Sequence, residues 1–291
     1  MDVWPTIAEP ELLARLTMSD EDFVALATGW AKAIEPREFT EELFAHGLAY
    51  PWTRPDHSYL LTGDRVERIH ALPEADAVER FPLLAIGANG APDRLTLRFA
   101  QLPDAERRVV VVAGDLHDFD VGPAAAVTTY GSLPATIFPS HGTAVRVQLL
   151  WVTAAQLGAL TATEISYRLG RLDGIRFVPD LDDAPDVDAV FALVSRWGAH
   201  CVGGEPVALA AVPAAGRFAP ALTQEQLLDH VATTVLGGDA RARDVVRAVT
   251  EDFATMGTAI VPVLLETARP FRSERWTPYP APRVGGSLSS P

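Results

Sequence analysis

Apolar residues recur at helical spacing in the first part of the chain. Leu12, Leu13 and Leu16 share one face of a predicted helix. Ser19, followed three residues later by Asp22, is typical of an N-cap, and it predicts a second helix. A third helix is predicted to start near residue 40, before a proline-rich stretch at 50–55. Residues 1–57 are therefore predicted to form a helical N-terminal extension.

The pattern changes to β-branched and apolar runs in the centre of the chain. A hairpin is predicted around Gly63-Asp64, and a turn is predicted at 140–142. A short helix should begin at Pro92, and another at Thr153, where Gln156 completes a capping box, and this second helix should end near Glu164. Buried strands are predicted at 83–86, 108–113, 119–129, 135–138, 144–152, 190–195 and 207–211. We therefore predict an α+β core over residues 58–215, a mixed β-barrel or sheet with flanking helices.

Helical spacing returns after this core. Residues 222–256 predict two helices that are interrupted at Gly237-Gly238, within a helical C-terminal segment spanning 216–269. The remainder, 270–291, is rich in Pro, Gly and Ser, and it is predicted to form a flexible tail.

Composition limits the classes of function. The hydrophobic fraction of 48% over 291 residues excludes a wholly disordered chain. The net charge of −14, without a local basic stripe, argues against nucleic-acid binding. A single cysteine, Cys201, excludes an intrachain disulfide framework and a thiolate metal cluster. The first residues lack a signal-peptide pattern and no apolar stretch is long enough to span a membrane, so we expect a cytoplasmic protein without membrane contact.

A glycine-containing loop follows the first predicted core strand. The apolar run 83–86 leads into Gly87-Ala88-Asn89, and a short helix follows. Glycine permits a backbone that points successive N–H groups outward, and the helix start adds partial positive charge. Such a group of donors suits a carboxylate or a developing oxyanion. A Gly-x-Asn sequence also serves as an ordinary turn, in which Asn89 caps the following helix.

An ordered set of segments accompanies this loop. They are Leu116-His117-Asp118-Phe119, Pro134-Ala135-Thr136-Ile137, Ser140-His141-Gly142, the strand 145–152, the helix containing Gln156–Leu160, and finally Glu164. In this order, across roughly residues 83–170, the chain resembles γ-glutamylcyclotransferase-like proteins. The family loop reads Tyr-Gly-Ser-Asn, whereas this chain has Ile86-Gly87-Ala88-Asn89 and lacks both hydroxyls. Its basic residues are almost all arginine, which indicates coding bias in a GC-rich genome and not a function. The chain resembles a divergent bacterial member of the family.

The resemblance implies a small-molecule substrate, a γ-glutamyl amine or amide, and neither a metal nor another cofactor. Glu164 would take a proton from the α-ammonium, the freed amine would attack the γ-carbonyl, and 5-oxoproline would form. The loop residues Ile86, Gly87, Ala88 and Asn89 would hold the glutamyl group, and Tyr130, Gly131 and Tyr167 would add contacts. Two alternatives stay open: a catalytically inactive binding or interaction protein of the same fold, and acyl transfer on a different small amide. From the residues alone, Glu164 could also be a solvated carboxylate at a helix end.

Three other groups of residues could carry chemistry. His117, Asp118 and Asp120 could ligate a cation, but neighbours in a strand point to opposite faces. Ser140 and His141 are adjacent and lack a nucleophile elbow, which argues against a serine hydrolase. His200-Cys201 could form a nucleophile pair, and the alternative is a buried cysteine at a strand end.

Overall fold

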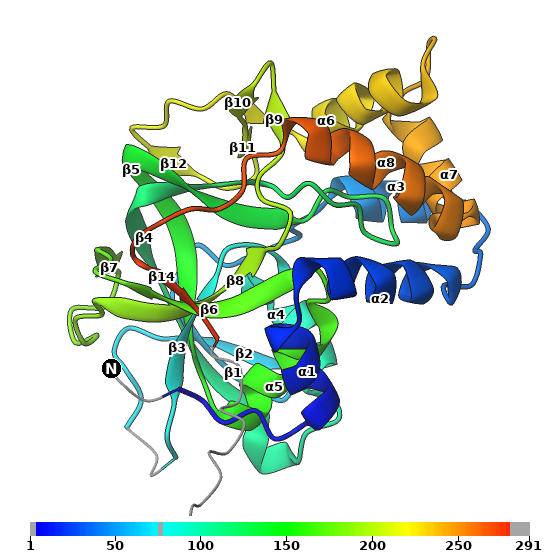
Figure 1. The fold of residues 1–291 in the computed structure, drawn as a ribbon. Coiled ribbons are helices and arrows are strands. Elements are labelled where there is room, and N and C mark those ends of the chain that lie inside the picture. The colour runs from blue at the N-terminus through cyan, green and yellow to red at the C-terminus, as the bar shows by residue number, and fades with distance from the viewer. Residues whose placement is uncertain (1–3, 75–77, 280–291) are drawn as a thin grey trace, which may run out of the picture.

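A large mixed sheet forms the centre of the computed structural model, which describes residues 4–74 and 78–279 (Figure 1). Its strands are β1 (Tyr59–Thr62), β2 (Arg65–Arg68), β3 (Phe81–Ala85), β4 (Arg108–Pro123), β5 (Ala135–Val152), β6 (Tyr167–Asp173), β7 (Phe177–Pro179), β8 (Ala189–Ser195), β12 (Ala214–Ala215) and β14 (Trp276–Pro278). The strand order is β14-β6-β8-β3-β5-β4-β1-β2, with β7 paired to β4 and β12 to β5. The β3–β8 pair is parallel and the other pairs are antiparallel, so the sheet is mixed.

Helices lie in two groups beside this sheet. They are α1 (Pro10–Thr17), α2 (Asp20–Lys32), α3 (Glu41–Leu48), α4 (Pro92–Phe99), α5 (Ala154–Thr163), α6 (Gln224–Val231), α7 (Ala242–Glu251) and α8 (Phe253–Thr267). Helices α1 and α4 pack against α5, whereas α3, α6 and α8 pack against α7. Helix α2 packs against α8 and lies between the two groups in Figure 1. The short strands β9 (Cys201–Val202) and β10 (Glu205–Pro206) form one small ladder, and β11 (Ala208–Leu209) and β13 (Ala221–Leu222) form another.

The two faces of the sheet bury separate apolar cores. Side chains alternate across a strand, so the neighbours Leu83 and Leu84 of β3 belong to different cores. The core around Leu83 includes residues of α1, α4 and α5, and the core around Leu84 includes residues of α6, α7 and α8. Strand β3 lies between β8 and β5 and contributes side chains to both cores. The loop that follows it is therefore anchored at the end of a central strand.

Several local predictions are confirmed. The hairpin around Gly63-Asp64 is formed by β1 and β2. Helix α5 has the predicted capping box of Thr153 and Gln156, and Glu164 is its C-cap residue. Ser19 caps α2 through the N–H of Asp22. Each of these features depends on residues that are close in the sequence.

Strand continuity was predicted wrongly. Segments 108–113 and 119–123 form one strand, β4, which ends before 124–129, and segments 135–138 and 144–152 form one strand, β5. The residues of the turn predicted at 140–142 lie inside β5, where residues 140–143 stand opposite Asp118 of β4 alone, whose φ is +65°. The Asp118 carboxylate accepts a hydrogen bond of 3.0 Å from the N–H of Gly142. Turn-forming residues are thus accommodated within a ladder that runs on both sides of them.

The C-terminal predictions need two corrections. The second predicted helix is two helices, α7 and α8, and Asp252 between them caps α8. The flexible tail predicted from residue 270 is wrong for residues 276–278, because β14 pairs with β6. Residues 280–291 of that predicted tail lie outside the described residues.

A buried ion pair ties the segment after β11 to the sheet. Asp120 of β4 is fully buried, and both its carboxylate oxygens accept hydrogen bonds of 2.8 Å from Arg217. Arg217 also donates to the carbonyl of Val212 at 2.7 Å. The carboxylate of Asp120, a candidate metal ligand in the sequence, is therefore paired with a guanidinium.

The described ranges contain no helix with the length and apolarity to cross a membrane. In the same ranges, no three His, Cys, Asp or Glu side chains gather in a way that could hold a metal ion.

Candidate functional site

The loop after β3 is shaped by close packing. Residues 88–90 form a short 3-10 helical turn before α4, and Gly87 precedes it with a φ of −134°. A Cβ atom on Gly87 would lie 2.5 Å from the hydroxyl oxygen of Tyr50 and 2.9 Å from Cβ of Ala135. Glycine is therefore required at position 87 because Tyr50 and Ala135 lie too close to admit a side chain, and not because the backbone is left-handed. The N–H groups of Ala88 and Asn89 have no acceptor within the described residues, as is usual at the start of a helical turn.

Glu164 lies directly against this loop. Its Oε1 accepts a hydrogen bond of 2.9 Å from Nη2 of Arg98 and one of 3.3 Å from Nδ2 of Asn89. The side chains of Arg98 and Glu164 are 14% and 16% exposed. Glu164 is therefore not a solvated helix-end carboxylate. The side chain of Asn89 makes no capping bond to α4, so the interpretation of Asn89 as a helix cap is also wrong.

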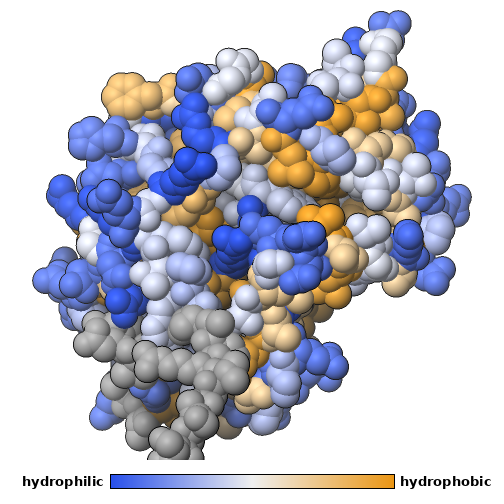
Figure 2. All heavy atoms as spheres, viewed as in Figure 1, coloured by the Kyte–Doolittle hydropathy of each residue, from blue (hydrophilic) through white to orange (hydrophobic). Residues whose placement is uncertain are grey.

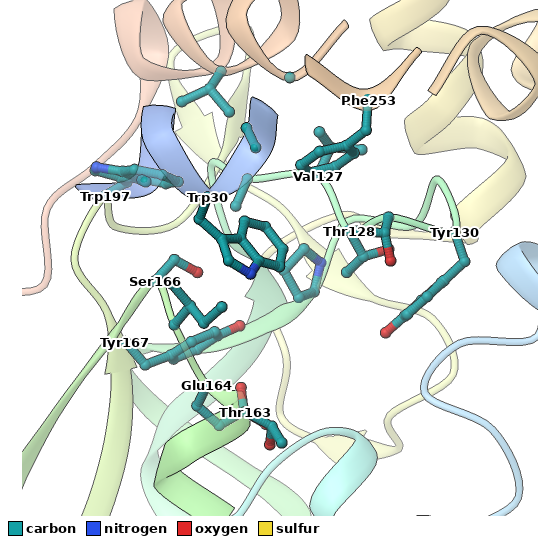
Figure 3. Close-up of a pocket in the computed structure, with 18 of the residues that line it drawn as sticks. Trp30, Val127, Thr128, Tyr130, Thr163, Glu164, Ser166, Tyr167, Trp197 and Phe253 are labelled. Carbon is teal, nitrogen blue, oxygen red and sulfur yellow. The ribbon is translucent and has the colours of Figure 1, made fainter. Parts of the chain in front are cut away.

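A cavity of about 840 Å³ opens beside Glu164 (Figure 3). Ala88, Tyr130, Glu164 and Tyr167, four of the predicted site residues, line it. Asn89 reaches it through its hydrogen bond to Glu164. The remaining three predicted residues, Ile86, Gly87 and Gly131, lie outside the lining. Gly131 instead packs against α7, where its Cβ would lie 2.9 Å from Val246.

Tyrosine hydroxyls surround the inner end of the cavity. The hydroxyl of Tyr167 donates to the carbonyl of Ala135 at 2.7 Å, and that of Tyr50 accepts from the N–H of Ala135 at 2.8 Å. Burial raises the pKa of Tyr130 to about 12, with a further contribution from the charge of Glu164. Burial likewise raises the pKa values of Tyr50 and Tyr167 above their usual range. All three therefore stay protonated at neutral pH. The proton of Tyr167 is already donated to Ala135, so Tyr50 and Tyr130 are the two of these that could donate to a ligand.

Three contributors to the site were absent from the sequence prediction: Arg94, Arg98 and Tyr50. Arg94 and Arg98 lie four residues apart in α4, so they share a face of the helix. The Nη1 atom of Arg98 is buried and has no partner among the described residues. The Arg94 guanidinium lies 4.1 Å from the ring centroid of Trp52. The i, i+4 arginine pair directly after a Gly-x-Asn loop was the available sequence signal, whereas no local pattern indicates Tyr50.

His200 and Cys201 do not form a reactive pair. Cys201 is 1% exposed, and burial raises the pKa of its thiol, which is opposite to the activation of a nucleophile. The ring nitrogens of His200 have no hydrogen-bond partner among the described residues. Burial, and secondarily the charge of His230, lowers the pKa of His200 to about 4. The alternative of a buried cysteine is thus favoured over a nucleophile.

This lowered pKa predicts a loss of stability in mild acid. Between pH 6.5 and about 4, the unfolded chain binds a proton at His200 that the folded chain does not, so the free energy of unfolding falls as the pH falls. We expect His200 to account for a loss on the order of 2–3 kcal/mol. Urea unfolding from pH 7 to pH 4 measures it. His200→Leu should flatten the dependence of the free energy of unfolding on pH, and His70→Gln, at an exposed position, should not. Equal dependence on pH in the wild type and both variants would contradict the prediction.

Comparison with known proteins gives weak similarity. No family model and no curated protein matches the chain. Among solved structures, an uncharacterized protein from Homo sapiens is similar at 17% identity and a TM-score of 0.32. A gamma-glutamyl cyclotransferase is similar at 18% identity and a TM-score of 0.31. Each similarity covers 40% of this chain and 67% of the other. At these scores the similarities carry no argument about this chain.

Proposed function

We propose that the cavity binds the head group of an α-amino acid derivative through Glu164 and Arg98, and that the chain is a γ-glutamylcyclotransferase-like enzyme. The observation that supports this most directly is the contact of 2.9 Å between the two side chains at the inner end of the cavity. An α-amino acid carries an ammonium and a carboxylate on one carbon atom. An adjacent carboxylate and guanidinium offer each of these charges an opposite partner.

The side chains can exchange their mutual contact for contacts with a substrate. The ammonium of the γ-glutamyl group would approach Glu164, and its α-carboxylate would approach Arg98. The buried Nη1 of Arg98 lacks an acceptor among the described residues, and a substrate carboxylate would supply one. Arg94 also lines the cavity and adds positive charge on the same side.

The reaction then needs one base that later acts as an acid. Glu164 takes a proton from the α-ammonium, and the α-nitrogen forms a bond to the γ-carbonyl carbon. As the bond from that carbon to the leaving nitrogen breaks, Glu164 returns this proton to the leaving amine. The second proton that the ring nitrogen loses passes to the same amine, which departs as an ammonium. The products are 5-oxoproline and the free amine. Because the attack is intramolecular, holding the substrate in a cyclising conformation supplies much of the rate.

Backbone donors are available for the oxyanion that develops on the γ-carbonyl oxygen. The N–H groups of Ala88 and Asn89 fit this role, since they lack acceptors within the described residues. The two hydroxyls of the family loop are absent at Ile86 and Ala88. Tyr50, from the N-terminal extension, brings a hydroxyl against Gly87 and lines the cavity, so we propose that it takes over part of their role.

A panel of amides tests this function. The full chain is incubated with γ-glutamyl amides of several amines, and 5-oxoproline and free amine are quantified by mass spectrometry. Equal amounts of both are expected. The N-acetyl derivatives serve as matched controls and should be inert, because their α-nitrogen cannot attack.

The other outcomes separate the competing functions. Release of amine without 5-oxoproline would indicate acyl transfer or hydrolysis. Binding of the amides without any turnover would indicate a binding protein of the same fold. The absence of both binding and turnover would contradict the proposal altogether.

A further inference from the structure

The cavity continues from Glu164 into a region between α2 and α8. Six of its lining residues come from α2, among them Val24 and Trp30, and six come from α8, among them Phe253 and Leu265. Figure 3 shows the indole of Trp30 between the Glu164 end and the side chains of Val127 and Phe253 in this view. The ring centroids of Trp30 and Phe253 lie 5.7 Å apart. Helices α2 and α8 are therefore in contact through these rings, and both line the same cavity.

The chemical character of the cavity differs between its two ends. The charged residues of its lining, Arg94, Arg98 and Glu164, all belong to α4 or to the end of α5. The α2 and α8 residues of the lining carry no charge. A ligand that fills the cavity must therefore be charged at one end and apolar at the other.

The apolar end is open and large enough to accept a ligand group. Val24, Trp30 and Leu265 are 51%, 38% and 39% exposed, although large apolar side chains are usually buried. Figure 2 shows apolar surface gathered over α2 and α8, with hydrophilic surface around it. At about 840 Å³, the cavity is near the upper end of the range of roughly 300–1,000 Å³ that holds drug-sized ligands. A glutamyl group alone leaves most of this space empty.

We infer that the α2–α8 region is a subsite for the leaving group, and that the substrates are γ-glutamyl amides of bulky, uncharged amines with alkyl or arylalkyl chains. This inference rests on the proposed function, because Glu164 and Arg98 fix the glutamyl end. An apolar amine extends from the amide nitrogen toward Trp30 and Phe253 and buries apolar area on both walls. A γ-glutamyl amino acid would instead bring a second carboxylate into walls that offer it no cation.

Two substrates that differ only in chain length test the inference. The kcat/KM for 5-oxoproline release is measured with γ-glutamyl hexylamide and γ-glutamyl methylamide. Burial of apolar chain favours the longer amide by up to about fourfold for each methylene. We expect a preference for the hexylamide of at least about tenfold. Equal values for the two amides, or a preference for γ-glutamylglycine, would overturn the inference and leave the proposed function intact.

A pair of variants on α2 locates the effect. Val24 lines the cavity, whereas Leu26, at 43% exposed, does not. Val24→Glu places a carboxylate in the apolar wall, so the preference for hexylamide should fall at least about tenfold. Leu26→Glu makes the same change at a comparable exposure, and it should leave the preference unchanged. Identical preferences in both variants would assign the selectivity to another surface and overturn the inference.

Binding distinguishes failure of the subsite from failure of the enzyme. If no amide is turned over, the proposed function fails, and the two amides are compared by calorimetric titration. Tighter binding of the hexylamide by at least about tenfold, lost in Val24→Glu and kept in Leu26→Glu, would still support the apolar subsite. Equal binding of the two amides would overturn it. So would a wild-type protein that sediments as a dimer without ligand while Val24→Glu sediments as a monomer, because a second copy would then cover this face.

Discussion

Replacing Glu164 by glutamine is expected to lower kcat/KM for 5-oxoproline release by about a hundredfold to ten-thousandfold, the usual range for loss of a general acid–base group. Glutamine keeps the shape of the side chain, and its amide oxygen can still accept from Arg98 and Asn89. It cannot take the proton of the α-ammonium. The loss should therefore appear in kcat, while binding of the amide changes less.

The control for this variant is Glu42→Gln, which makes the same change at an exposed position of α3. It should match the wild type in turnover. Thermal unfolding of both variants shows whether the fold is kept, because the glutamine side chain would still fill the contact with α4. Equal turnover by the wild type and Glu164→Gln would contradict the proposed mechanism, whichever substrate is used.

Replacing Arg217 by leucine is expected to lower the free energy of unfolding by about 3–5 kcal/mol. The change leaves the carboxylate of Asp120 fully buried and without its two hydrogen bonds from the guanidinium. An unpaired buried charge costs far more than an unpaired surface charge, because water cannot solvate it. Urea unfolding at pH 7 measures the difference.

Two further variants test whether the loss of stability comes from the unpaired buried charge. Arg243→Leu breaks the pair between Arg243 and Glu41, which lies at the surface, and it should change stability far less. Asp120→Leu combined with Arg217→Leu removes both charges and should recover much of the lost stability. A small effect of Arg217→Leu, similar to that of Arg243→Leu, would show that Asp120 does not depend on its partner.

Most of the local elements could be predicted from the sequence. The capping box of Thr153 and Gln156, the cap at Ser19 and the hairpin at Gly63-Asp64 each involve residues within a few positions of one another. The signal of strand β6 is weaker, because Leu169 and Gly170 are both buried and the alternation of buried positions is interrupted between them.

The strand boundaries could not be predicted in the same way. Residues 140–142 have the composition of a turn, but pairing of β4 with β5 on both sides keeps them in one strand. Likewise, the composition of the C-terminal region indicates a flexible tail, and pairing with β6 orders residues 276–278. In both places hydrogen bonds to a distant strand outweigh the local preference of the chain.

The same distinction between local and long-range contacts applies to the candidate site. The sequence by itself determined that a Gly-x-Asn loop follows a buried strand and that Glu164 ends a capped helix, since both depend on neighbouring residues. Only the tertiary structure decided that Asn89, Arg98 and Glu164 meet, that Tyr50 lies against Gly87, and that α2 and α8 enclose an apolar space. These contacts join segments far apart in the chain, and they form because burying the two faces of the sheet brings those segments together.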